Sequence, residues 1–183
     1  MMAALKKTTK TFIVLGMHRS ATSLVAGGLH NFGVDMGKKL LGGPDSNYNE
    51  LEDMDFLRLN WKILKEAGGS WDNPPSEKKI LALKEKFAPE IKKLVENKSG
   101  LWGWKDPRTT LTIKLYLPYL KNPHFICCFR DPLEVAKSLY KRQKMPIEKG
   151  LKLAGIYNQR LLKFLRELYE NPKIYHFNTY CSI

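Results

Sequence analysis

The 183-residue sequence predicts an α/β fold, a three-layer P-loop-like arrangement in which helices flank a mainly parallel central sheet. Two short apolar runs, 11–15 and 124–129, are rich in β-branched, aromatic and small residues and are typical of buried parallel strands. Each run is followed by a segment with helical features, and alternation of strand and helix is the pattern of a parallel sheet. Since 43% of the residues are hydrophobic, we expect one domain over 11–183 behind a flexible tail, 1–10.

Apolar spacing and helix breakers predict the elements in chain order. Strands are expected at 11–15, 101–104, 124–129 and 173–177. Helices are expected at 22–32, 50–67, 77–97, 109–117, 133–142 and about 151–168. The third of these contains Pro89, where we expect a kink or a break. Segments 33–49 and 68–76 are rich in Gly, Pro, Asn and Asp or contain paired prolines, so they are expected to be loops.

The charge balance points to an anionic partner. Thirty-one Lys and Arg residues against 18 Asp and Glu give a net charge of +13, and residues 137–173 carry ten basic and three acidic side chains. Nucleic acid, an acidic membrane surface and a phosphorylated small molecule all fit this charge. The chain contains no apolar run of about 18 residues and no signal-peptide pattern, which favours a cytoplasmic protein without a membrane span.

The three cysteines predict neither a disulfide framework nor a metal site. Cys127 and Cys128 are adjacent and Cys181 lies near the end of the sequence, so no CxxC pair occurs. Zinc sites need closely spaced ligand pairs, and we expect no metal. Cys127 and Cys128 are interpreted as small apolar residues of a buried strand.

The loop after the first strand, 16–23 with the sequence GMHRSATS, has the features of a phosphate-binding site. A turn between a parallel strand and a helix directs backbone N–H groups and the positive end of the helix dipole at an anion. The candidate ligand-binding residues in it are Gly16, His18, Arg19, Ser20, Ala21, Thr22 and Ser23. The alternative is a capped helix with an exposed arginine.

The same loop differs from the Walker A sequence of ATP-binding proteins. That sequence is G-x-x-x-x-G-K-[ST], and here Ala21 and Thr22 occupy the positions of the second Gly and the Lys. The only cation of the loop, Arg19, lies three positions earlier than that Lys. The loop is therefore of the P-loop kind but a poor candidate for an ATPase.

A second candidate phosphate site follows the strand expected at 124–129. Arg130 comes directly after that strand, and Ser138 lies two turns into the next helix. Residues at the carboxyl ends of parallel strands face the crevice where α/β proteins bind ligands. One Arg and one Ser suffice for a single phosphate group.

Together these motifs resemble the two nucleotide-binding signatures of the P-loop sulfotransferase family, whose donor is 3′-phosphoadenosine-5′-phosphosulfate (PAPS). GMHRSATS is similar to the element that binds the 5′-phosphosulfate, and FRDPLEVAKS to the element that binds the 3′-phosphate. Two further stretches, 47–60 and 104–108 (WKDPR), resemble the branch with bacterial and Golgi-type members. The resemblance covers about 12–139, some two-thirds of the chain.

This resemblance implies a PAPS-dependent sulfotransferase that acts on a hydroxyl or amine of a small molecule or glycan. Two features depart from the family pattern: Ala21 stands where Gly is usual, and Arg19 stands where cytosolic members carry Lys. Members of the family generally continue past the position of Ile183 with a segment that closes over the nucleotide. The resemblance therefore also allows a C-terminally truncated relative of the family. The sequence makes no prediction of oligomeric state.

The resemblance also implies catalytic roles. Arg19 would stabilise charge on the leaving phosphate, and Lys105 would hold the sulfuryl or leaving oxygen, although an ion pair that fixes the turn is an equal interpretation. Glu52 lies at the position of the catalytic base, with Asp53 as the neighbouring alternative and His18 as the rival. Acidic residues at a helix start often interact only with the dipole.

Two other function classes remain open. A P-loop kinase or NTPase would need a Walker B aspartate, for which Asp131 is the nearest candidate. A nucleic-acid-binding protein would use the charge of +13, although no known nucleic-acid motif is present. The sulfotransferase interpretation expects no nucleic-acid partner.

Overall fold

The computed structural model describes residues 9–37, 51–170 and 180–182. The strand expected at 173–177, most of the expected tail and most of the expected loop 33–49 lie outside these residues. No helix among the described residues is long and apolar enough to span a membrane.

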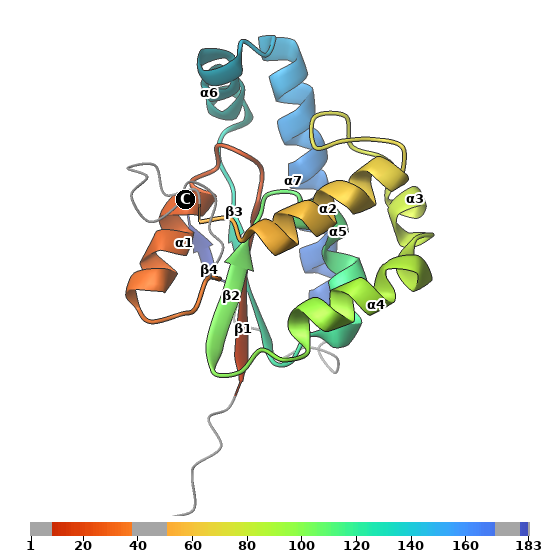
Figure 1. The fold of residues 1–183 in the computed structure, drawn as a ribbon. Helices are drawn as coiled ribbons and strands as arrows, with labels where there is room; N and C mark the ends of the chain where they lie inside the picture. The colour runs from red at the N-terminus through yellow and green to blue at the C-terminus, as the bar shows by residue number, and fades with distance from the viewer. Residues whose placement is uncertain (1–8, 38–50, 171–179, 183) are drawn as a thin grey trace, which may run out of the picture.

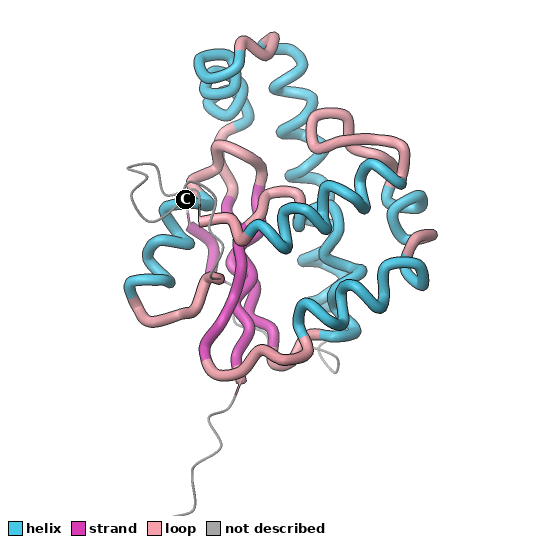
Figure 2. Tube along the Cα trace, viewed as in Figure 1, coloured by secondary structure: helices cyan, strands magenta, loops and turns pink. Residues whose placement is uncertain are grey.

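The chain folds around a parallel sheet (Figure 2). β1 (Lys10–Gly16) lies in the middle, between β2 (Leu101–Lys105) and β3 (Pro123–Cys128), and the short β4 (Tyr180–Ser182) pairs with the far edge of β3. All the pairings are parallel, which confirms the α/β fold with a parallel sheet. Because the order is β2-β1-β3-β4, the chain leaves β1 towards one side and later returns on the other. Such a reversal opens a crevice at the carboxyl ends of the strands.

Both faces of the central strand are buried by helices. Side chains alternate between the faces of a strand, so Ile13 and Leu15 pack into one apolar cluster and Val14 into another. Figure 1 shows α1 on one side of the sheet and α2, α4 and α5 on the other. Cys127 and Cys128 are buried residues of β3, as the sequence predicts.

The helices follow the apolar spacing closely. Their bounds are α1 (Thr22–Asn31), α2 (Met54–Glu66), α3 (Glu77–Leu81), α4 (Lys84–Val95), α5 (Thr109–Tyr116), α6 (Pro132–Gln143) and α7 (Ile147–Glu170), with a 3₁₀ turn η1 (Leu117–Tyr119) after α5. The helix expected at 50–67 begins late because Asp53 is its N-cap, and the Asp53 carboxylate accepts a hydrogen bond from the Asp55 amide at 2.9 Å.

The break in the segment 77–97 lies at residues 82–83 and not at Pro89 as predicted. Pro89 lies inside α4, where its missing N–H removes one hydrogen bond to the first turn of the helix. Burial of Phe87, Ile91 and Val95 on one face keeps the helix in place despite that loss.

α6 and α7 pack closely where a glycine removes the side chain. A Cβ atom added to Gly150 of α7 would lie 2.9 Å from both the Cα and the Cβ atoms of Ala136 on α6. At Gly155, five residues further along α7, an added Cβ atom would meet no atom within 4 Å. The approach of the two helices therefore depends on the first glycine and not on the second.

We expect Gly150→Ala to lower the free energy of unfolding by about 1–3 kcal/mol, because overpacking forces the two helices apart. The matched variant Gly155→Ala should be neutral or stabilise the protein by up to about 1 kcal/mol, because Ala has the higher helix propensity. Urea denaturation of both variants measures the difference. Equal effects of the two substitutions would contradict the packing argument.

Candidate functional site

The candidate site begins at Gly16, the last residue of β1. Its φ is +151°, and an added Cβ would lie 2.6 Å from the carbonyl oxygen of Cys128 on β3, so only glycine fits. The Gly16 amide donates to the Thr110 hydroxyl oxygen at 2.9 Å, and that hydroxyl donates to the Gly16 carbonyl at 3.2 Å. α5 thereby fixes the start of the loop at the carboxyl ends of β1 and β3.

The loop 17–21 turns back through two left-handed residues. Arg19 has φ +70° and Ala21 has φ +62°, although neither is a glycine. Ala21 occupies the N-cap position of α1, but its side chain cannot accept a hydrogen bond. The backbone N–H groups of the first turn, at Thr22 and Ser23, therefore have no side-chain acceptor at the N-cap. The buried Ser20 hydroxyl has no hydrogen-bond partner among the described residues. An uncapped helix start beside a buried hydroxyl suits an anion.

The two predicted phosphate-binding elements meet at Arg19. Its Nε donates to the Ser138 hydroxyl on α6 at 2.9 Å, and its carbonyl oxygen accepts a hydrogen bond from Arg130 Nη1 at 2.9 Å. Arg19 is thus in direct contact with Ser138, which lies 119 positions later in the sequence, and with Arg130, which lies 111 positions later. Arg130 also lies 3.9 Å from Glu134, but this exposed ion pair contributes little to the stability of the fold.

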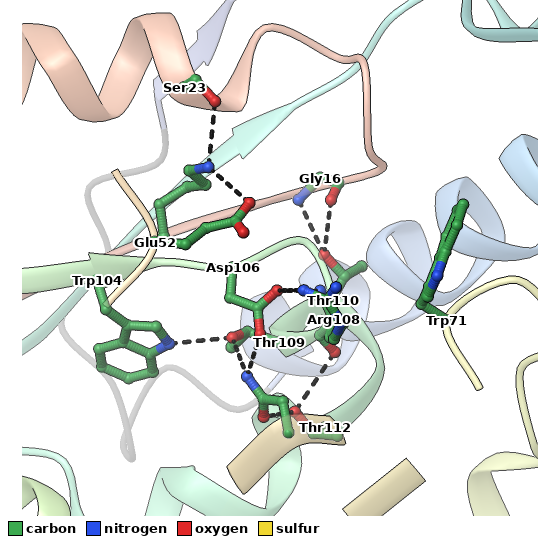
Figure 3. Close-up of polar contacts among 12 residues, drawn as sticks. Gly16, Ser23, Glu52, Trp71, Trp104, Asp106, Arg108, Thr109, Thr110 and Thr112 are labelled. Atoms are coloured by element: carbon green, nitrogen blue, oxygen red, sulfur yellow. Dashed lines mark hydrogen bonds and ion pairs between the residues drawn. The ribbon is translucent and has the colours of Figure 1, made fainter. Parts of the chain in front are cut away.

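Lys105, Glu52 and Ser23 form a buried cluster beside the loop (Figure 3). Lys105 ends β2, is only 1% exposed, and donates to Glu52 at 2.8 Å and to the Ser23 hydroxyl at 3.1 Å. Glu52 precedes α2 and Ser23 belongs to the first turn of α1. The cluster therefore joins three segments at the carboxyl end of the sheet.

The two charges of this cluster depend on each other. Burial raises the pKa of Glu52, and the positive charge of Lys105 acts in the opposite direction. The Lys105 side chain is almost fully desolvated, so its ammonium group would be a costly unpaired charge without Glu52. The pair therefore holds both ionised groups beside the helix start of α1.

A buried hydrogen-bond network behind the cluster was not among the sequence-based candidates. The Asn60 amide on α2 donates to Asp106 at 2.8 Å and to the Thr109 hydroxyl at 2.9 Å, and accepts from Thr112 at 2.7 Å and Tyr116 at 2.9 Å. Figure 3 shows three of these partners close together: Asp106, which follows β2, and Thr109 and Thr112 of α5. The available signal was an asparagine on the apolar face of the predicted helix 50–67.

Asp106 and Arg108 form the local ion pair that the sequence analysis gave as an alternative role for this turn. Arg108 Nη1 lies 2.7 Å from Asp106, whose same oxygen also accepts from the Arg108 amide at 3.1 Å. Lys105 is not part of that pair, since its partner is Glu52. Burial acts against the charged form of Arg108, but the negative charges nearby, chiefly the Asp106 carboxylate and then that of Glu52, raise the pKa of Arg108.

His18 packs against the loop between α2 and α3. Its ring lies 4.4 Å from the Trp71 ring, and its Nδ1 is buried without a partner among the described residues. Burial is the main reason that the pKa of His18 lies well below 6.5. The positive charges of Arg108, Lys105 and Arg19 lower the pKa of His18 further, and the effect of Arg19 is the smallest of the three.

The structure therefore brings most of the predicted residues to one end of the sheet. The loop, Arg130 and Ser138 make one group, and Glu52 with Lys105 makes a second, joined to the first through Ser23. In residues 9–37 and 51–170, no set of three His, Cys, Asp or Glu side chains could hold a metal ion. Comparison with protein-family models found no match, and comparison with curated proteins found no significant one.

The low pKa of His18 predicts a pH dependence of stability. Below pH 6.5 the unfolded chain binds a proton at His18 that the folded chain does not bind, so the free energy of unfolding falls as the pH falls. The slope reaches about 1.4 kcal/mol per pH unit. Between pH 7.5 and 5.5 we expect the wild type to lose about 1 kcal/mol more than His18→Gln, as measured by urea denaturation. Parallel losses in the two proteins would exclude a neutral buried His18.

Proposed function

We propose that the chain binds PAPS and transfers its sulfuryl group to a hydroxyl or amine of a small molecule or glycan. In this proposal the fold is a three-layer P-loop-like fold, in which helices cover both faces of the parallel sheet. The loop 16–23 binds the 5′-phosphosulfate of the donor. The four motifs that resemble the sulfotransferase family support it from the sequence side. The geometry at Arg19 supports it from the structural side.

The contacts of Arg19 with Ser138 and Arg130 carry the proposal. A nucleotide with phosphates at both its 5′ and 3′ positions needs two anion sites within the length of one nucleoside. The uncapped helix start of α1 would supply one site, and Arg130 with Ser138 would supply the other. Because Arg19 touches both elements, they are close enough for one such molecule.

The reaction would be an in-line displacement at sulfur. The bond from sulfur to the 5′-phosphate oxygen breaks, a bond from sulfur to the acceptor oxygen or nitrogen forms, and adenosine 3′,5′-bisphosphate leaves. Arg19 and the loop amides would stabilise the charge that develops on the leaving phosphate. Lys105 would hold a sulfuryl or leaving oxygen while its hydrogen bond to Ser23 keeps it at the helix start.

Glu52 would accept the proton of the acceptor. Burial raises the pKa of Glu52, which makes it a stronger base, and the ion pair with Lys105 acts in the opposite direction and favours the carboxylate that a base requires. Asp53 suits this role less well because its carboxylate caps α2. His18 packs against the Trp71 ring, and its buried Nδ1 has no hydrogen-bond partner among the described residues.

The alternative of a P-loop kinase gains no support from Asp131. The Asp131 carboxylate accepts hydrogen bonds from the amides of Leu133 at 2.8 Å and Glu134 at 3.0 Å, and so caps α6. A Walker B aspartate serves the metal of a nucleotide instead. The nucleic-acid alternative rests on net charge alone.

Adenosine 3′,5′-bisphosphate should stabilise the protein in a thermal-shift experiment, whereas ATP with Mg²⁺ should not. At 100 times its Kd a ligand adds about 2.7 kcal/mol, which raises the Tm of a chain of this size by roughly 5–10 °C. Arg130→Ala should abolish the shift. The control Arg166→Ala should keep it, because Arg166 is an exposed residue of α7 whose guanidinium lies 3.8 Å from Glu170.

Each contrary result has a distinct meaning. A shift with ATP and Mg²⁺ alone would replace the sulfotransferase proposal by a kinase or NTPase. A bisphosphate shift that survives in Arg130→Ala would remove the 3′-phosphate site from Arg130. No shift with either nucleotide would overturn the donor proposal.

Glu52→Gln should lower kcat by about 10²–10⁴-fold, because the acceptor loses its base, while the bisphosphate still binds. The substitution also leaves Lys105 without its counter-charge, so we expect the free energy of unfolding to fall by about 3–5 kcal/mol. Asp53→Asn is the matched control and should keep kcat. Sulfate transfer from labelled PAPS measures the rates, and loss of activity in Asp53→Asn alone would assign the base to Asp53.

A further inference from the structure

α6, the turn after it and the first part of α7 form one end of the molecule, which stands clear of the sheet (Figure 1). We call residues 132–152 the α6–α7 end. It carries six basic and two acidic side chains, so these 21 residues hold four of the 13 net positive charges of the chain. The proposed sulfate transfer uses only Ser138 of this end, so that reaction does not account for the surplus of positive charge.

The outer face of α6 combines apolar and basic side chains. Leu133, Lys137, Tyr140 and Lys141 lie at the helical spacing i, i+4, i+7 and i+8, so they share one face. Leu133 is 44% exposed and Tyr140 is 52% exposed. Lys137 forms an ion pair with Glu134 of the same helix at 2.8 Å. The buried residues of α6 lie on the opposite face and are Val135, Ala136 and Leu139.

Three further cations of the α6–α7 end have no acidic partner within 4 Å among residues 9–37, 51–170 and 180–182. They are Lys141, Lys144 and Lys152, and all three are exposed. The Nζ atom of Lys144, which is the C-cap of α6, lies 5.7 Å from the centroid of the Tyr140 ring. The outer face of α6 therefore presents an aromatic ring next to charges that no described carboxylate neutralises.

This combination of side chains favours an anionic lipid bilayer over other polyanions. A bilayer matches both parts of the surface, because its anionic headgroups attract lysines and its acyl boundary takes up leucine and tyrosine side chains. A nucleic-acid backbone also attracts lysines, but it gives an exposed leucine no apolar surroundings. An acidic peptide is usually held in a groove or along a sheet edge, whereas the outer face of a protruding helix is convex.

We propose that the outer face of α6 binds an anionic membrane surface. Leu133 and Tyr140 enter the headgroup region, while Lys141 and Lys144 contact the anionic groups of the lipids. The apolar stems of the two lysines lie along the bilayer surface and their ammonium groups stay at the headgroups. This binding goes beyond the proposed sulfate transfer and does not depend on it.

Co-sedimentation with lipid vesicles tests the proposal. We expect vesicles of equal parts phosphatidylserine and phosphatidylcholine to bind the protein at least about tenfold more tightly than vesicles of phosphatidylcholine alone. Lys141→Gln/Lys144→Gln should weaken binding to the anionic vesicles about 10–30-fold, since each lysine near such a surface contributes about fivefold in affinity. The matched control is Lys78→Gln/Lys84→Gln, which removes the same charge from exposed positions of α3 and α4 and should weaken binding far less.

A second variant tests the apolar part of the surface. Tyr140→Gln leaves the charge unchanged and should weaken binding to the anionic vesicles about fivefold, because the bilayer no longer takes up the ring. Glutamine has a good helix propensity, so we expect α6 to persist in this variant. Urea denaturation of each variant shows whether the fold is kept.

Several results would overturn the membrane proposal. They are absence of vesicle binding, equal binding to both kinds of vesicle, equal losses in the two double variants, and unchanged binding in Tyr140→Gln. Binding of a DNA duplex instead of the vesicles, with a loss in Lys141→Gln/Lys144→Gln, would assign the surface to nucleic acid. None of these measurements uses a nucleotide donor, so their outcome is separate from that of the sulfotransferase proposal.

Discussion

The Asn60 side-chain amide is the interaction on which the geometry of the site depends most directly. Its two N–H groups and its carbonyl oxygen bond to four side chains, so its full hydrogen-bonding capacity is used in a buried place. Through Asp106 it fixes the turn that follows Lys105, and through Thr109 it fixes the start of α5. The next residue of α5, Thr110, holds Gly16. One amide thus links α2, the end of β2 and the start of the phosphate-binding loop.

The parallel sheet and its helices could be predicted because the local sequence carries their signals. A short apolar run such as 11–15 identifies a buried strand, and the glycine that ends it marks the turn. The closeness of Gly16 to Cys128 also follows from the parallel order of β1 and β3, since their carboxyl ends lie at the same edge. For that reason, the position of one motif after each strand was enough to predict that Arg19 and Arg130 lie close together.

The remaining features depend on contacts that no local pattern contains. The partner of Lys105 is Glu52, 53 positions earlier, whereas the ion pair that the sequence offered as one of two equal interpretations lay within the turn 105–108. The break after α3 was assigned to Pro89, because the cost of a proline is local while the compensating burial of Phe87 and Ile91 is tertiary. The role of Asn60 was missed for the same reason: an amide on an apolar helix face shows its four partners only in the fold.

The position of Cys128 gives the sheet a built-in chemical reporter. Burial raises the pKa of its thiol to about 11, so at neutral pH only about one thiol in ten thousand is the reactive thiolate. Because the Cys128 side chain is also 0% exposed, alkylating reagents reach its sulfur only when the end of β3 opens. Because Cys128 is the register partner of Gly16, the rate of alkylation measures how often the strand pair separates beneath the phosphate-binding loop. Any molecule that holds this loop closed would slow the labelling without touching the sulfur.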